Sequence, residues 1–252
     1  MTGLAVHGAT VVATGSIDVG VHPTFRFLGM TFNIDTMYTT AIAAAVTLVL
    51  MWLVARRATS GVPGKAQVVV EAVLKQTRTY VEQAVGHDVP PWLVPLGFAL
   101  FFFILFCNWL EWFPSGHHPE RLGPPTADTN LTFALTVIVV VGYTYIGFKR
   151  KRARYIGNMI TAKPAGVGAF IAIVIDQIAN PLALALRLFG NVLASGIMFA
   201  VIGLLPWQWF WLFGPANVIW RLFDVGVILS IQAFIFAFLT ILYFGFALSE
   251  EH

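Results

Sequence analysis

The stretch PLALALRLFGNVLASG, residues 181–196, places Arg187 inside an apolar segment that extends from about Pro164 to Leu205. A second apolar segment runs from about Pro215 to Leu248. Each segment holds roughly 35 to 40 residues, whereas an upright helix crosses a bilayer with about 20. The two segments therefore predict long, strongly tilted or bent helices. We expect them to form a hairpin, with the Trp-rich turn LPWQWFWLFGP at the outer membrane interface.

The composition identifies the class of protein. Of the 252 residues, 58% are hydrophobic and 11% are charged, and the mean hydropathy is +0.79. Soluble domains carry about 25% charged residues, so this chain lacks the charge to coat a water-facing surface. A soluble enzyme, a disordered chain and a fibre are excluded. The single Cys107 excludes an intramolecular disulfide and a cysteine metal site. The pI near 9.2 is explained by basic cytoplasmic loops, and no nucleic-acid partner is expected.

Three shorter apolar segments and one amphipathic segment precede the long pair. Residues 64–86 combine an apolar stripe of Val69, Val73, Tyr80 and Ala84 with interspersed charges, which is typical of a helix lying on a membrane surface. Packing against a soluble partner is the alternative. The sequence thus predicts an all-α membrane protein of about five membrane helices plus one interfacial helix. The expected organisation is an outer amino-terminal segment, 1–36, and one membrane domain, 37–252, with spans near 37–55, 92–110, 130–148, 165–205 and 215–248.

Basic residues give the expected orientation. Arg56 and Arg57 close the first span, and a basic cluster from Lys149 to Arg154 follows the third. By the positive-inside rule both lie in the cytoplasm, which places the amino terminus outside and the carboxyl terminus inside. No basic region followed by an apolar core and cleavage site opens the chain, so a signal peptide is not expected. A bacterial plasma membrane is favoured.

Few charges interrupt the long apolar pair. Between Ala165 and Leu248 the ionisable residues besides Tyr243 are Asp176, Arg187, Arg221 and Asp224. A charge at mid-bilayer costs a few kcal/mol, so each is a candidate functional residue.

A polar row includes Arg187. Asp176, Asn180, Arg187 and Asn191 are spaced by four, seven and four residues, and Ser195 follows after four more, so helical geometry predicts one common face. Asp176 and Arg187 would stand about 16 Å apart, too far for an ion pair. The partner of Arg187 is therefore an acid elsewhere in this chain or in another subunit.

The chemistry of arginine suggests a role for this side chain. A guanidinium does not release its proton in proteins, but it favours the ionised form of a nearby carboxylate, so Arg187 suits an electrostatic gate. Gln232 could pair with Arg187, line a hydrated path, or form an ordinary interhelical hydrogen bond. Asp224 could neutralise Arg221, three residues earlier, or line a proton entry path.

Four patches carry a family resemblance. Besides residues 181–196, these are FCNWLEWFPSG (106–116), PPTADTNLTFALTV (124–137) and SIQAFIFAFLTILYF (230–244). In this order they resemble subunit a of the rotary F-type ATP synthases, over nearly all of the chain beyond residue 35. The resemblance implies a non-catalytic, proton-conducting stator subunit without a cofactor. Its implied partners are the c-subunit ring, b-type peripheral stalk subunits, the remainder of the complex and membrane lipid.

The resemblance also implies site residues. Arg187 would face the carboxylates of the c ring between two offset half-channels, with Asn191 and Gln232 nearby and Asp176 toward the cytoplasmic exit. Many members carry an outer Glu or His where this chain has Gly196, and a partner for it at Val225. Asp224 is expected to take that role. The expected proton-translocation set is Arg187, Asn191, Gln232, Asp176, Asn180, Asp224 and Ser195, and the expected outer entrance is Asn108, Glu111, Asp128 and Asn130.

Other functions fit less well. In a secondary transporter of a small anion, Arg187 would clamp the substrate, but no internal repeat is evident. A haem-binding redox subunit needs paired ligands within the membrane. The histidines all lie outside the predicted spans, at His7, His22, His87, His117, His118 and His252. No phosphate-binding G-x-x-x-x-G-K-[ST] loop is present. The expected coupling ion is the proton rather than sodium.

Overall fold

The computed structural model describes residues 24–27, 30–58, 64–86, 89–112, 123–151, 179–203 and 210–248. Helices account for most of these residues. They are α1 (Ile34–Arg57), α2 (Lys65–Val85), α3 (Leu93–Trp109), α4 (Thr129–Lys151), α7 (Asn180–Gly203), α8 (Phe210–Phe223) and α9 (Leu229–Leu248). Short helical turns are η1 (Leu110–Trp112), η2 (Pro125–Ala127) and the π-helical η5 (Asp224–Ile228). Strands β1 (Thr24–Phe27) and β2 (Met30–Asn33) pair antiparallel immediately before α1.

Five helical segments in the described ranges are long and apolar enough to cross a membrane. They are Ile34–Arg57, Leu93–Trp112, Thr129–Arg150, Pro181–Met198 and Gly214–Leu248. The prediction of an all-α membrane protein is therefore confirmed, with the short β-hairpin as an addition. Helix α1 begins at Ile34, three residues before the expected start of the first span at residue 37, with Asn33 as its N-cap and Asp35 in its first turn.

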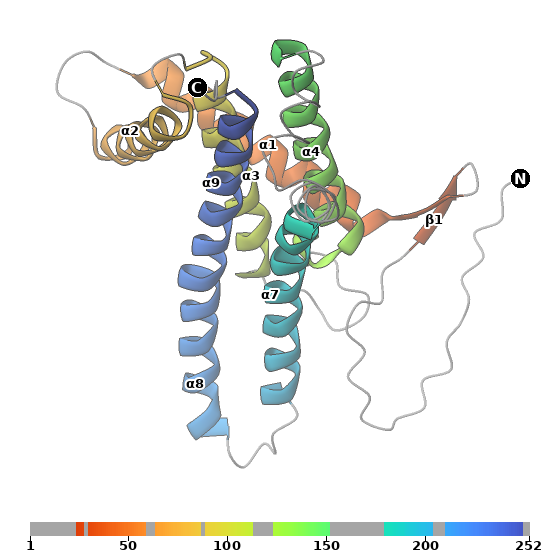
Figure 1. Cartoon of the computed structure of the whole chain (residues 1–252). Helices are drawn as coiled ribbons and strands as arrows, with labels where there is room; N and C mark the ends of the chain where they lie inside the picture. The colour runs from red at the N-terminus through yellow and green to blue at the C-terminus, as the bar shows by residue number, and fades with distance from the viewer. Residues whose placement is uncertain are drawn as a thin grey trace, which may run out of the picture.

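The two long carboxyl-terminal segments lie side by side. Figure 1 shows α7 beside the rod formed by α8, η5 and α9, and both extend away from the remaining helices. This is the predicted hairpin. The described part of the first long segment begins at residue 179, so its expected portion from 165 to 178 lies outside the described residues.

Helix α3 occupies the centre of the bundle, where it packs on α9, α1 and α2. Its Leu93 and Ile104, together with Phe236 of α9, are fully buried. In a bilayer the lipid is as apolar as the core, so close packing rather than hydrophobicity holds such helices together.

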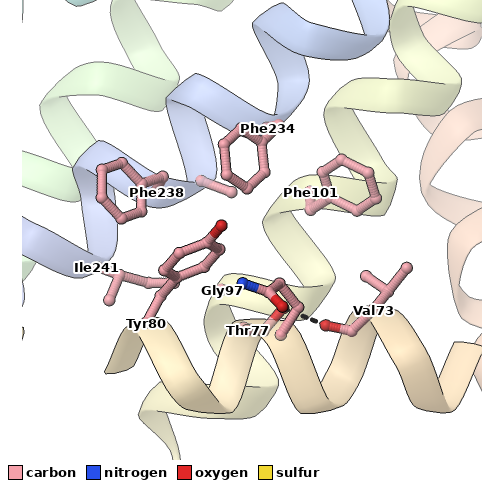
Figure 2. Close-up of a pocket in the computed structure, with 10 residues that line it drawn as sticks. Val73, Thr77, Tyr80, Gly97, Phe101, Phe234, Phe238 and Ile241 are labelled. Carbon is pink, nitrogen blue, oxygen red and sulfur yellow. Dashed lines mark hydrogen bonds between the residues drawn. The ribbon is translucent and has the colours of Figure 1, made fainter. Parts of the chain in front are cut away.

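Helix α2 lies across the end of the bundle, beside the carboxyl end of α9 (Figure 1). Figure 2 shows Tyr80 projecting toward Phe234 and Phe238, with ring centroids 5.6 and 5.0 Å apart. These rings line an apolar cavity of about 140 Å³ between α2, α3 and α9. Val73 also lines it, whereas Val69 is 62% exposed, so the predicted stripe is used within the chain except at its first residue.

Gly245 sets how closely α9 approaches α2. A Cβ atom at Gly245 would lie 2.8 Å from the backbone oxygen of Ala84 and 2.9 Å from its Cβ. Because backbone cannot move aside cheaply, we expect Gly245→Ala to lower the stability of the α2 contact by about 1–3 kcal/mol. Thermal unfolding of the detergent-solubilised complex measures this loss. Gly64→Ala adds the same methyl group where nothing lies within 4 Å, so an equal effect of both variants would contradict the prediction.

Candidate functional site

A buried cluster of two acids and one hydroxyl joins α7 to the neighbouring elements. Ser195 Oγ of α7 lies 2.7 Å from Glu111 Oε1 of η1 and also contacts Asp224 Oδ2 of η5. The exposed fractions are 2% for Ser195, 6% for Glu111 and 3% for Asp224. A hydroxyl has one proton to donate. Both contacts are therefore hydrogen bonds only when one carboxyl group is itself protonated, so the cluster is suited to hold one extra proton.

A second polar contact lies one helical turn earlier on α7. Asn191 Nδ2 donates to Gln232 Oε1 of α9 at 3.0 Å. Gln232 is 2% exposed, and within the described ranges its Nε2 has no hydrogen-bond partner. A buried amide donor of this kind needs an acceptor, which a water or a group on another chain can supply.

Arg187 lies on the exposed face of α7. Its side chain is exposed in the single chain, and no hydrogen bond or ion pair joins it to another described residue. Small side chains flank it on this face, at Ala183, Gly190 and Ala194, and a Cβ at Gly190 would meet nothing within 4 Å. The face is therefore shaped for close approach of another helix.

The residues of the predicted polar row do not all lie on one face of α7. Ser195 lies eight positions after Arg187, and each residue rotates the helix by about 100°. Ser195 therefore points roughly 80° away from Arg187 around the helix axis. Arg187 is thus exposed, Asn191 is half-buried and Ser195 is buried. The structure brings Asn191 into contact with Gln232 of α9 and Ser195 into contact with Asp224 of η5, whereas Arg187 is exposed.

Asp128 belongs to a separate buried group at the start of α4. Its Oδ2 accepts from Asn33 Nδ2 at 2.6 Å and from Thr36 Oγ1 at 2.8 Å, and its Oδ1 accepts from the Asn130 backbone N–H at 2.8 Å. Asp128 therefore ties the beginning of α1 to the beginning of α4, while the Asn130 side chain is exposed. Sequence reasoning missed Asn33 and Thr36. Two polar residues at the start of an apolar helix were the signal that could have indicated a buried polar contact there.

Asn108 lies between the two groups and is fully buried. Its Nδ2 donates to the Leu229 backbone oxygen at 3.0 Å, and its Oδ1 accepts from Thr126 Oγ1 at 2.8 Å. Nearby, Arg221 Nη2 donates a hydrogen bond to the Glu111 backbone oxygen at 2.9 Å.

The remaining candidate residues complete the site. Val225 is buried beside Val192 and Leu229, and a Cβ at Gly196 would meet nothing within 4 Å. Asn180 begins α7, but its side chain and the whole of Asp176 lie outside the described part of the chain. Among the described residues, no group of three His, Cys, Asp or Glu side chains could hold a metal ion.

Comparisons with known proteins cover almost the whole chain. Residues 37–245 match the family described as ATP synthase A chain. The chain is 41% identical to ATP synthase subunit a of Acidothermus cellulolyticus over 94% of this chain and 87% of that protein. It is 41% identical to ATP synthase subunit a of Mycobacterium marinum over 96% of this chain and 98% of that one. The subunit a of Coxiella burnetii is 34% identical over 88% of this chain and 87% of its own length.

Proposed function

The chain belongs to the ATP synthase A chain family, and from this premise we propose that it is the proton-conducting stator subunit of an F-type ATP synthase membrane sector. In this role it performs no chemistry on nucleotides. It provides two offset half-channels and couples proton flow to rotation of a c-subunit ring. Its further partners are b-type stalk subunits and the rest of the complex in a bacterial plasma membrane, with the amino terminus outside and α2 at the cytoplasmic interface.

The exposed Arg187 is the observation that carries this proposal. A permanent charge facing lipid from an apolar spanning helix is costly, so the side chain requires a partner of opposite charge. Small neighbours at Ala183, Gly190 and Ala194 allow a partner helix to approach. A ring carboxylate passing this face would lose its proton to the exit path and take one from the entry path. The fixed charge of Arg187 would keep protons from crossing directly.

The buried cluster of Glu111, Ser195 and Asp224 supports an outer proton relay. Because it can hold one extra proton, it can receive a proton from one side and release it to the other. Asp224 then replaces the usual acid or histidine that Gly196 and Val225 lack. Asn191 and Gln232 lie between this cluster and Arg187 along α7. Asn108, Glu111, Asp128 and Asn130 border the outer entrance. Asp176 lies toward the cytoplasmic exit, and Asn180 belongs to the proton-translocation set.

Complementation in native membranes tests the function. Inverted vesicles from cells lacking this chain should show no ATP-driven proton pumping, although the soluble sector still hydrolyses ATP. Restoring the chain should restore pumping. If pumping is unchanged without the chain, or if the purified chain alone carries a small anion into liposomes, the proposal is overturned in favour of a secondary transporter.

A further inference from the structure

The π turn η5 lies between two residues that contact α7. In η5 the Leu229 N–H donates to the Asp224 backbone oxygen, five residues back, so this turn holds one residue more than an α-helical turn. Asp224 opens the turn and contacts Ser195, while Gln232 follows it and contacts Asn191. Single π turns within α-helices occur often at functional sites.

The extra residue decides which way Asp224 points. Gln232 lies eight positions after Asp224 in the sequence. In an unbroken α-helix they would lie about 80° apart around the axis, because each residue adds about 100°. One additional residue in the turn removes about 100°, which leaves the two within roughly 20° of each other. Both side chains can then face α7 at once.

Two residues at the carboxyl end of α3 donate hydrogen bonds to the residues that directly follow this turn. Asn108 Nδ2 donates to the Leu229 backbone oxygen at 3.0 Å, immediately after η5. Trp109 Nε1 donates to Ser230 Oγ at 3.2 Å, and Ser230 Oγ donates to the Val225 backbone oxygen at 3.3 Å, inside η5. The Asn108 amide is itself fixed by Thr126 Oγ1 at 2.8 Å.

We infer that Asn108 is a positioning residue that holds the π turn and thereby aims Asp224 at Ser195. This inference rests on the proposed function and gives Asn108 a definite part at the outer entrance. Asn108 acts through its Nδ2 donor, which bonds the Leu229 backbone oxygen, while its Oδ1 accepts from Thr126. An amide neither releases nor takes up a proton, so Asn108 does not carry the proton itself. Asp224 is the group that Asn108 positions.

Asn108→Asp distinguishes a positioning residue from a residue that lines a hydrated path. The carboxylate keeps the acceptor for Thr126 but replaces the donor to Leu229 with an oxygen that repels it. We expect ATP-driven pumping in inverted vesicles to fall about tenfold or more, since a buried acceptor loses its donor. As a control, Thr136→Val removes a buried hydroxyl that bonds only within α4, and it should leave pumping near the wild-type rate. Full pumping by Asn108→Asp would overturn the inference.

Deletion of Gly226 is a second variant, which tests whether Asn108 acts through the π turn. The deletion should convert η5 into a regular turn, with Asp224 and Gln232 seven residues apart and again within about 20° of one another. We therefore expect the deletion to retain pumping and to make Asn108→Asp much less harmful, measured as a double-mutant cycle. Equal losses from Asn108→Asp with and without Gly226 would contradict a role through the π turn. If Asn108→Asp alone fails to assemble, assembly regained in the double variant still supports it.

Failure of the proposed function would give a different pumping result from failure of the inference about Asn108. Vesicles without this chain would then pump as well as vesicles with it, whatever residue occupies position 108. Loss of pumping without the chain, combined with normal pumping by Asn108→Asp, would reject only the inference about Asn108.

Discussion

Replacing Arg187 with Ala should abolish both proton-driven ATP synthesis and ATP-driven proton pumping while leaving the complex assembled. Without the guanidinium, a passing ring carboxylate has no opposing charge in the membrane, and the two half-channels lose their electrostatic barrier. We expect coupled rates to fall by at least about a hundredfold, the scale of removing a preorganised charge from a site that excludes water. Inverted vesicles, in which the catalytic sector faces the added nucleotides, measure both activities. Recovery of the variant chain together with the soluble sector after detergent extraction reports assembly.

Two variants sharpen this test. Leu182→Ala truncates an apolar side chain that is 40% exposed on the same helix and should retain coupled activity. Arg187→Lys keeps a positive charge but loses the planar, permanently protonated guanidinium, so we expect it to recover little of the activity. Wild-type rates in Arg187→Ala would show that the gate lies elsewhere.

The membrane architecture could be predicted from the sequence because its signals are local. The apolar segments gave five spans and the long hairpin, and the amphipathic pattern gave α2. The start of α1 was placed three residues late because Ile34 and Asp35 follow a segment with no clear period. The β-hairpin was not predicted for the same reason.

The contacts of the candidate site could not be predicted because they depend on distant pairings. Glu111 lies 84 residues from Ser195, and Asn33 lies 95 residues from Asp128. The identities of the candidate residues came from the scarcity of charge in apolar helices and from the family resemblance. Their partners required the fold.

The π turn shows this limit most clearly. Regular helical periodicity would turn Asp224 about 80° away from the face of Gln232. No pattern in residues 224–228 marks the added residue, so the sequence predicts a long, tilted or bent segment from Pro215 to Leu248 without locating the interruption. The structure instead has α8, η5 and α9, and this interruption is what allows Asp224 to reach Ser195.

Replacing Asp224 with Asn should reduce proton flow through the outer half-channel by about a hundredfold, the usual contribution of a positioned acid or base. The amide keeps the shape of the carboxyl group but neither releases nor takes up a proton. Ser195→Ala should cause a smaller loss, because it breaks the bridge and leaves both acids, whereas Ser195→Thr retains the hydroxyl and should retain more activity. ATP-driven pumping in inverted vesicles measures each variant. Asp35→Asn makes the same change at a buried carboxyl group of α1 and should largely preserve pumping.

A rescue variant separates loss of a relay from loss of structure. A side chain at position 196 would start in open space, since nothing lies within 4 Å of a Cβ there. Gly196 also directly follows Ser195, and the family resemblance implies an outer Glu or His at this position. Adding Gly196→Glu to Asp224→Asn should therefore restore part of the pumping. Damage to packing would not be repaired by a carboxylate on another helix, so recovery would identify the missing function as proton transfer. Full activity of Asp224→Asn alone would instead remove Asp224 from the proton path and leave Glu111 as the only acid of the buried cluster able to serve it.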